Sequence, residues 1–586
     1  MAALLSLRLR RWEHRIVSCV MAGLTLVALL PIWTVRFLPL QDYPLHLLRE
    51  YIITHYSDPV TRYYDNFIVS LFPIPYNLCD YIVVGLNLFL PITTAGKLLL
   101  TLYVVLLPLS LWYALRSVDR GKTVLAPASF LLTYNWYFAK GMTSNLIAFP
   151  FFLFAIGYWW HHRLHPTWKH HLGLAGLVFC VYLAHLYCFL YLFFSLLVLA
   201  LLTFRKWNAV RPVLLAFAPS LLLLGITVVS QMPLFERDLD PLVIEYPSLK
   251  GRLAMVLTSR LDLPYFTTFS PWREQRILLA AGLLLGGLAL VRWRALLRNA
   301  FFGLFVALFL LYLAMPEFLS PKGQLYFSIR VLILICFVGF LCVDVPAQPL
   351  ARACTLGVFV LLSLYSLLGS LRDYRAIGPG LDDYYAAIQS IPPGERVSFR
   401  VDPRAMYLGN VTPYAFFGGY YYIERGQGKI PPLLEGCCAG LLRSLRYRFP
   451  EQLTSELEAD MARGAVDIGG YAMVLPRGQQ VKVTALAQKF GFRPLLETTK
   501  LDVYRKVRMV RGPNWIRGPY YICGLKTNYN YLLIWQDPNR TDPAVDQQLQ
   551  LIFSQGKAQV WKRRHEVGDD SPLEPCLPCG DPQPLP

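Results

Sequence analysis

The chain has 586 residues, of which 55% are hydrophobic and only 16% are charged, and its formal net charge is +19. A soluble protein carries about 25% charged residues, so this composition excludes an ordinary soluble protein and indicates a membrane protein. The positive charge does not indicate a nucleic-acid-binding protein, because no basic block forms a recognisable binding motif. Arginines that set membrane topology account for it instead.

The first apolar segment runs from about Ile16 to Phe37 and follows an N-terminal stretch that contains four arginines. It is too long for the apolar region of a signal peptide, and no small-x-small cleavage site follows it. We therefore predict an uncleaved first span, with the N-terminus in the cytoplasm.

An outer loop, residues 38–97, follows this span and contains Gln-Asp-Tyr-Pro-Leu-His at positions 41–46. A carboxylate (Asp42) and an imidazole (His46) at the mouth of a membrane helix carry a desolvation cost that a purely structural helix end need not bear. Two interpretations are open. Asp42 is either the N-cap of a helix from Tyr43 to Tyr56 or a catalytic residue.

The later spans are recognised by hydropathy, and the charges between them define the topology. Every short basic loop falls on the side of the N-terminus, as the positive-inside rule requires, provided that residues 81–90 form a re-entrant or surface-lying helix. The fold class is therefore mainly α, with about eleven spans in a transmembrane domain at residues 1–372. The spans after the first centre on 98–115, 124–139, 146–160, 172–186, 188–204, 212–230, 277–291, 299–315, 329–343 and 355–371.

Residues 373–507 are of ordinary polarity and are predicted to form a small extracytoplasmic α/β domain. The expected elements are helices at 381–390 and 481–490 and strands at 396–401, 471–475 and 501–505. A C-terminal extension, 508–586, adds a candidate strand at 531–535 and ends in a Pro-rich tail that we expect to be disordered. Asn410 and Asn539 each begin a glycosylation acceptor triplet.

The segment 161–171 contains five histidines and looks like a metal cluster. It lies in a predicted inner loop, however, and no cysteine or acid accompanies it. An interfacial border, in which histidine, tryptophan and arginine reach toward the head groups, is the favoured interpretation.

The remaining polar residues concentrate on the outer side. A channel or ion-coupled transporter would place ionisable residues near the bilayer midplane, often in two repeated halves, and this chain shows neither feature. A cleft at the outer surface fits an enzyme whose substrate head group lies at the interface. The candidate binding residues are Lys140, His185, Glu236, Arg237, Asp238, Lys322 and Arg330.

A basic N-terminus, one span and a long outer loop that begins with an acid resemble the glycosyltransferase-C superfamily. The segment 41–46 also resembles the Asp-Tyr-Pro-x-His loop of uncharacterised bacterial membrane proteins within that group. The resemblance implies an inverting membrane enzyme that transfers a sugar from a polyprenyl-phosphate donor to a lipid, glycan or protein acceptor. It places that reaction outside the cytoplasm, at the periplasmic face of a bacterial inner membrane.

By the same resemblance, Asp42 matches the first-loop acid that acts as catalytic base or helps to bind a metal ion. His46 orients Asp42, contacts the phosphate or simply packs. Many members carry a second acid in the next outer loop, but residues 139–145 contain no carboxylate. The need for a divalent metal ion is therefore open, and a second acid would come from Asp65 or from the 236–240 segment.

The phosphate partners expected on chemical grounds are Lys140, Arg237, Lys322 and Arg330, each of which has the alternative of an interfacial anchor. Two other functions stay open. The first is a non-catalytic subunit of a membrane complex with other membrane subunits, and the second is a transporter of a lipid-linked glycan.

Overall fold

The structure is a computed structural model of the full chain. It describes residues 2–65, 67–69, 72–204, 210–235, 244–246, 248–249, 252–253, 266–316, 318–319, 324–325, 328–395, 397–401, 405, 407–429, 442–444, 465–468, 471–474, 530–536 and 549–563.

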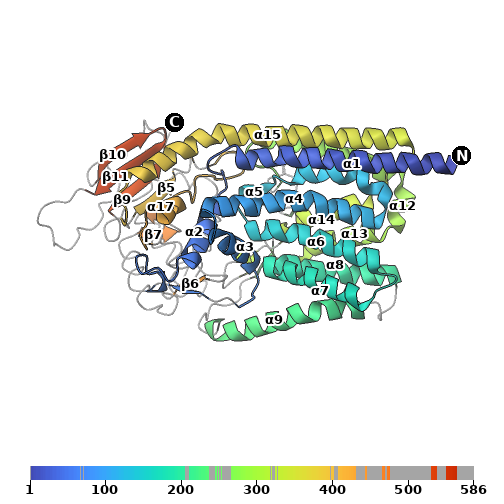
Figure 1. Cartoon of the computed structure of the whole chain (residues 1–586), viewed down its shortest axis with the longest axis horizontal. Coiled ribbons are helices and arrows are strands. Elements are labelled where there is room, and N and C mark those ends of the chain that lie inside the picture. The colour runs from blue at the N-terminus through green and yellow to red at the C-terminus, as the bar shows by residue number, and fades with distance from the viewer. Residues whose placement is uncertain are drawn as a thin grey trace, which may run out of the picture.

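Long helices run side by side and form most of the described chain (Figure 1). Within the described residues, six helices are long and apolar enough to cross a membrane: Arg15–Trp33, Ile92–Val118, Leu186–Phe204, Arg211–Val229, Pro271–Val291 and Pro349–Ser390. The mainly helical, membrane-type architecture expected from composition is therefore confirmed at this level.

Most predicted spans coincide with helices of similar or greater length. The first is α1 (Ala2–Trp33), which continues toward the N-terminus beyond the apolar segment. The others are α4 (Ile92–Val118), α6 (Thr143–His162), α7 (Trp168–Ala184), α8 (Leu186–Phe204), α9 (Arg211–Phe235), α11 (Pro271–Val291), α13 (Ala300–Ala314) and α14 (Ile329–Cys342).

The span predicted at 124–139 is not an α-helix. It is a 13-residue 3₁₀-helix, η2 (Arg120–Leu132), followed by the short helix α5 (Trp136–Ala139). The Ser129 hydroxyl donates to the carbonyl three residues before it, at 2.7 Å, and Pro127 has no N–H for an α-helical bond. A 3₁₀-helix rises about 2.0 Å per residue, so η2 is about 26 Å long, close to the thickness of a hydrocarbon core.

The helix α15 (Pro349–Ser390) is continuous through the predicted boundary at residues 372/373 and includes the helix predicted at 381–390. Its 42 residues extend about 63 Å, roughly twice the depth of the hydrocarbon core. Gly378, Pro379 and Gly380 look like a break in the sequence. A side chain at Gly380 would lie 2.6 Å from the Tyr414 hydroxyl, so this glycine permits close packing instead of ending the helix.

The C-terminal part of α15 packs against a four-stranded sheet of order β10-β11-β9-β5. Strands β5 (Val397–Val401) and β9 (Tyr531–Trp535) were both predicted and pair in parallel, and β8 (Tyr471–Val474) is the predicted strand at 471–475. The hairpin of β10 (Leu549–Gln555) and β11 (Ala558–Arg563) was not predicted. The helix expected at 481–490 and the strand expected at 501–505 lie outside the described residues.

The first outer loop and the region after α15 pack together (Figure 1). The loop contains α2 (Tyr43–Thr54), β1 (Phe67–Val69) and α3 (Asn77–Asn87). The helix α2 corresponds to the helix predicted from Tyr43 to Tyr56, and α3 corresponds to the helix predicted at 81–90. β1 pairs with β6 (Leu442–Ser444), and α2 packs on α17 (Gly419–Glu424). Phe37 joins the two regions, because its ring lies 5.3 Å from Phe417 and 5.0 Å from Tyr420.

Candidate functional site

Asp42 lies where three distant segments of the chain meet. The Gln41 amide donates to the Ala139 carbonyl at 3.0 Å, and the Asp42 amide donates to the Lys140 carbonyl at 2.9 Å. From the C-terminal side, the Thr412 hydroxyl donates to the Gln41 side-chain oxygen. The first outer loop, the loop before α6 and the segment after α15 thus converge on Gln41 and Asp42.

The carboxylate of Asp42 does not cap α2. The residue occupies the N-cap position, and its carbonyl accepts the amides of Leu45 and His46, but its side chain makes no capping hydrogen bond. Instead, Oδ1 accepts from Gln41 Nε2 at 3.0 Å. Asp42 as a whole residue is half-buried. The capping interpretation therefore leaves the carboxylate unexplained.

Lys140 is the cation of this site. Its ammonium donates to the Gln41 side-chain oxygen at 2.5 Å and lies 5.4 Å from the centre of the Trp136 ring. Burial raises the pKa of Asp42 to about 6, although Lys140 and the Gln41 hydrogen bond oppose this rise. Burial also lowers the pKa of Lys140, and Asp42 opposes that change. The pair combines a proton acceptor near neutrality with an adjacent positive charge.

Gly141 allows the loop before α6 to approach the start of α2 closely, and we expect its replacement by alanine to destabilise the protein. It has a φ of +73°, and a Cβ there would lie 2.6 Å from the Tyr43 amide nitrogen. Gly141→Ala should destabilise the protein by more than about 2 kcal/mol, measured by unfolding in mixed detergent micelles. Gly85→Ala in α3 is the matched control, since a Cβ there meets nothing within 4 Å. Equal stability of the two variants would show that the close approach of Gly141 to α2 is wrong.

His46 does not contact the Asp42 carboxylate through any hydrogen bond in the described part of the chain. Burial, together with the nearby Arg49, lowers the pKa of His46 to about 3, so the ring is neutral at physiological pH. The prediction that His46 orients Asp42 has no geometric support, and its contact with a substrate stays a prediction.

A second polar cluster, which the sequence analysis missed, lies on α2 and α3. The Arg49 guanidinium forms an ion pair with Asp80, whose side chain is fully buried. Glu50 is 1% exposed, and neither of its carboxylate oxygens has a hydrogen-bond partner among the described residues. Burial, and secondly the charge of Asp80, raise the pKa of Glu50 well above its ordinary value. Burial and the charge of Asp80 therefore favour the protonated form of Glu50.

The structure brings His185 and Arg330 together, as their shared place on the outer side suggested. Arg330 Nη1 lies 3.0 Å from His185 Nε2, and its guanidinium lies 5.0 Å from the centre of the Tyr187 ring. The ring of Tyr76, which precedes α3, stands edge-on to His185 at 4.8 Å. Tyr76 has a φ of +77°, a strained conformation for a non-glycine residue, which places it at this pair.

Four of the predicted binding residues cannot be placed in the site. Glu236, Arg237, Asp238 and Lys322 lie outside the described residues. Within the ranges that are described, no three His, Cys, Asp or Glu side chains are grouped so that they could hold a metal ion. Asn410 donates to the Thr267 hydroxyl at 2.7 Å, and Thr412 of the same triplet contacts Gln41, so both have structural partners.

An apolar cavity of about 460 Å³ lies along the helices. Its floor on α11 is formed by Gly282 and Gly286, whose Cα positions face open space. One of its lining residues, Phe266, is the neighbour of Thr267, which contacts Asn410, two residues before Thr412. At Phe266 the cavity therefore borders the segment that contacts Asn410. Its other walls come from η2, α12, α13 and α14.

Comparison of the chain with protein-family models gives no match, and comparison with curated protein sequences gives no significant match either.

Proposed function

We propose that the protein is a membrane glycosyltransferase that transfers a sugar from a polyprenyl-phosphate donor to a hydroxyl of a lipid, glycan or protein acceptor. One observation carries the proposal: Asp42 is half-buried, its carboxylate makes no capping hydrogen bond, and it lies beside Lys140. A structural acid at a helix end would use its oxygens on backbone amides.

The chemistry follows from this arrangement. Asp42 takes the proton of the acceptor hydroxyl, whose oxygen forms a bond to the anomeric carbon of the donor sugar. The bond between that carbon and the phosphate oxygen breaks, and the phosphate leaves with the electron pair. Lys140 supplies positive charge close to Asp42, where it favours the departing phosphate.

Arg330 and His185 are a second candidate for the phosphate. Among the described residues, no carboxylate forms an ion pair with Arg330, and its Nε is buried without a hydrogen-bond partner. A guanidinium without a counter-ion at the edge of a membrane suits a phosphate group. Arg237 and Lys322, which lie outside the described residues, remain proposed phosphate partners, and Glu236 and Asp238 remain proposed substrate-binding residues.

The apolar cavity supports a lipid-linked donor. It is lined almost entirely by apolar side chains, and its glycine floor on α11 leaves room for a hydrocarbon chain. A soluble nucleotide-sugar donor has no hydrocarbon chain that could fill such a cavity. We assign the polyprenyl chain to this cavity and the sugar phosphate to the Asp42 site.

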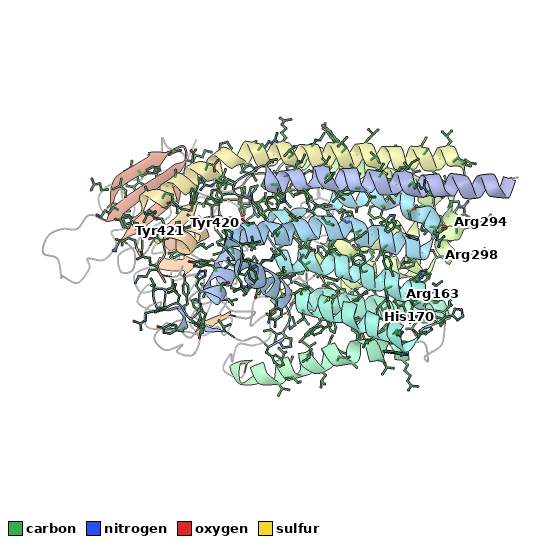
Figure 2. All side chains as sticks on the ribbon, viewed as in Figure 1. Arg163, His170, Arg294, Arg298, Tyr420 and Tyr421 are labelled. Carbon is green, nitrogen blue, oxygen red and sulfur yellow. The ribbon has the colours of Figure 1, made fainter. Side chains whose placement is uncertain are left out.

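The topology that we propose has about eleven spans, a cytoplasmic N-terminus and an extracytoplasmic C-terminal domain. Figure 2 shows Arg163, Arg294 and Arg298 at the end of the helices opposite to Tyr420 and Tyr421. The positive-inside rule assigns the arginine end to the cytoplasm. Asp42 then faces the outside, which in a bacterium is the periplasmic side of the inner membrane.

The pH dependence of transfer tests this proposal. An ionised Asp42 is the active form, so the rate should rise with pH and reach half of its maximum near pH 6, following the raised pKa of Asp42. The assay measures labelled sugar transferred by the purified chain in proteoliposomes that contain a panel of polyprenyl-phosphate sugars. A half-maximum near pH 4, the range of an ordinary carboxyl group, would argue against Asp42 as the base.

One observation favours the alternative of a non-catalytic subunit. In the described part of the chain, Asp42 interacts with Gln41 and Lys140 and with no second carboxylate. Absence of transfer from every donor in the panel, combined with purification of a stoichiometric complex, would establish that alternative. Movement of a lipid-linked glycan across the bilayer without turnover would instead establish a transporter.

A further inference from the structure

A second cavity, of about 270 Å³, lies at the end of the helices that carries the basic residues. It is formed where α6 ends, α7 begins, α8 ends and α9 begins. Trp159, Leu174, Phe204 and Pro212 contribute apolar walls. The polar lining consists of Tyr158, His162, Arg163, His170 and His171, and none of the described lining residues is a carboxylate. Figure 2 labels Arg163 and His170 at this end.

Arg163 gives the cavity a fixed positive charge. Its guanidinium lies 3.8 Å from the centre of the Trp160 ring and donates to the Trp160 carbonyl. Among the described residues, its buried Nε has no hydrogen-bond partner and no carboxylate forms an ion pair with Arg163. Trp160 in turn contacts Phe301 at 4.6 Å between ring centres, which fixes the stack against α13.

His170 adds a directed hydrogen-bond donor. The Thr167 amide donates to His170 Nδ1 at 3.1 Å, so this nitrogen is unprotonated and the neutral ring carries its proton on Nε2. In the described part of the chain no hydrogen bond engages Nε2. The His162 ring stacks on His170 at 3.7 Å and contacts Tyr158 at 4.7 Å, so the two imidazoles form one fixed face.

We propose that this cavity binds the phosphate head group of an anionic phospholipid. Arg163 and His170 contact the phosphate, and the apolar walls contact the beginning of the acyl chains. A guanidinium without a counter-ion and an N–H donor beside apolar surface match the two parts of such a molecule. This inference is independent of the glycosyltransferase proposal, because it concerns the opposite end of the helices.

The surroundings indicate a lipid and not a soluble phosphate. Leu164, Trp168 and Leu172 next to the cavity are 60%, 69% and 65% exposed. Large apolar side chains at the end of spanning helices, with a tryptophan among them, are typical of the membrane interface. A soluble anion would gain nothing from the apolar walls, whereas a phospholipid contacts both the walls and the exposed rim.

Native mass spectrometry of the full chain, released from micelles that contain phosphatidylglycerol, tests the proposal. The double substitution Arg163→Gln with His170→Gln should weaken the first bound phosphatidylglycerol by about tenfold or more. The matched control, His165→Gln with Arg298→Gln, removes one histidine and one arginine from exposed positions in the same end region and should change the affinity by less than about twofold. Arg163→Lys keeps the charge and should retain most of the binding, which separates recognition from misfolding.

Three results would overturn the proposal. Equal weakening by the cavity and control substitutions would show only a general basic surface. Equal binding of phosphatidylcholine would show that the anionic head group is not recognised. Inorganic phosphate that displaces phosphatidylglycerol at comparable concentration would show that the site takes a soluble anion.

Discussion

Asp42→Asn is expected to lower sugar transfer by about 10²–10⁴-fold while leaving the protein folded, because an amide cannot accept the acceptor proton. The substitution keeps Oδ1, which accepts from Gln41 Nε2, so the local hydrogen bond survives. Since burial disfavours the ionised carboxylate, the neutral amide should leave stability unchanged or raise it. Transfer rates in proteoliposomes and unfolding in mixed micelles measure the two effects.

Asp58→Asn is the matched control for this experiment. Asp58 belongs to the same outer loop, and its Oδ1 accepts the Val60 amide at 2.8 Å, a bond that asparagine can also accept. The transfer rate of the Asp58→Asn variant should stay within about twofold of the parent protein, because Asp58 takes no part in the proposed reaction. Transfer by Asp42→Asn at more than about a tenth of the parent rate would contradict a general-base role.

Arg49→Met is expected to cost about 3–5 kcal/mol of stability, because it leaves the fully buried Asp80 without its ion-pair partner next to Glu50. Adding Asp80→Asn should recover most of the loss, since it removes the uncompensated buried charge. The double-mutant cycle should give a coupling energy of about 2–3 kcal/mol, measured by unfolding in mixed detergent micelles.

Arg116→Met provides the comparison for a cation outside the cluster. Arg116 is exposed on α4 and only stacks over Trp112 at 5.3 Å, so its loss should cost less than about 1 kcal/mol. Losses of equal size for Arg49 and Arg116 would mean that the Arg49–Asp80 pair contributes little. The cluster would then add little to the stability of the contact between α2 and α3.

The sequence predicted best the positions of the helical spans and the shared side on which Asp42 and Lys140 lie. Apolar runs of about 20 residues leave few alternatives to membrane helices, so their positions follow from composition. Both Asp42 and Lys140 stand at helix ends on the same predicted side. The sequence therefore placed them on one face, although it did not predict the backbone hydrogen bonds that join their loops.

Other features depend on packing that hydropathy does not record. An apolar run such as 120–132 has the same composition as an α-helix or a 3₁₀-helix, and the neighbours α1, α4 and α15 decide between them. At Gly380, α15 lies close to the ring of Trp535 and the hydroxyl of Tyr414, which are distant in sequence. The hairpin at 549–563 was missed because its first strand, β10, has a mostly exposed face and a weak alternation.

Glu50 was missed for a related reason. A glutamate in a helix that also contains other polar residues is expected to face solvent. Glu50 nevertheless lies on the same side of α2 as the buried Tyr43 and Leu47. Its spacing of seven and three residues from them was the available signal. An acid on an apolar stripe costs stability, so such a position is a candidate for function or for a buried ion pair.

The most direct test of the account is a density map of the full chain in lipid nanodiscs loaded with a polyprenyl monophosphate. We predict density for the phosphate within hydrogen-bonding reach of Lys140 and beside the Asp42 carboxylate, with the polyprenyl chain in the cavity floored by Gly282 and Gly286. A phosphate bound elsewhere, with Asp42 turned onto backbone amides and no opening beside it, would contradict the proposed enzyme.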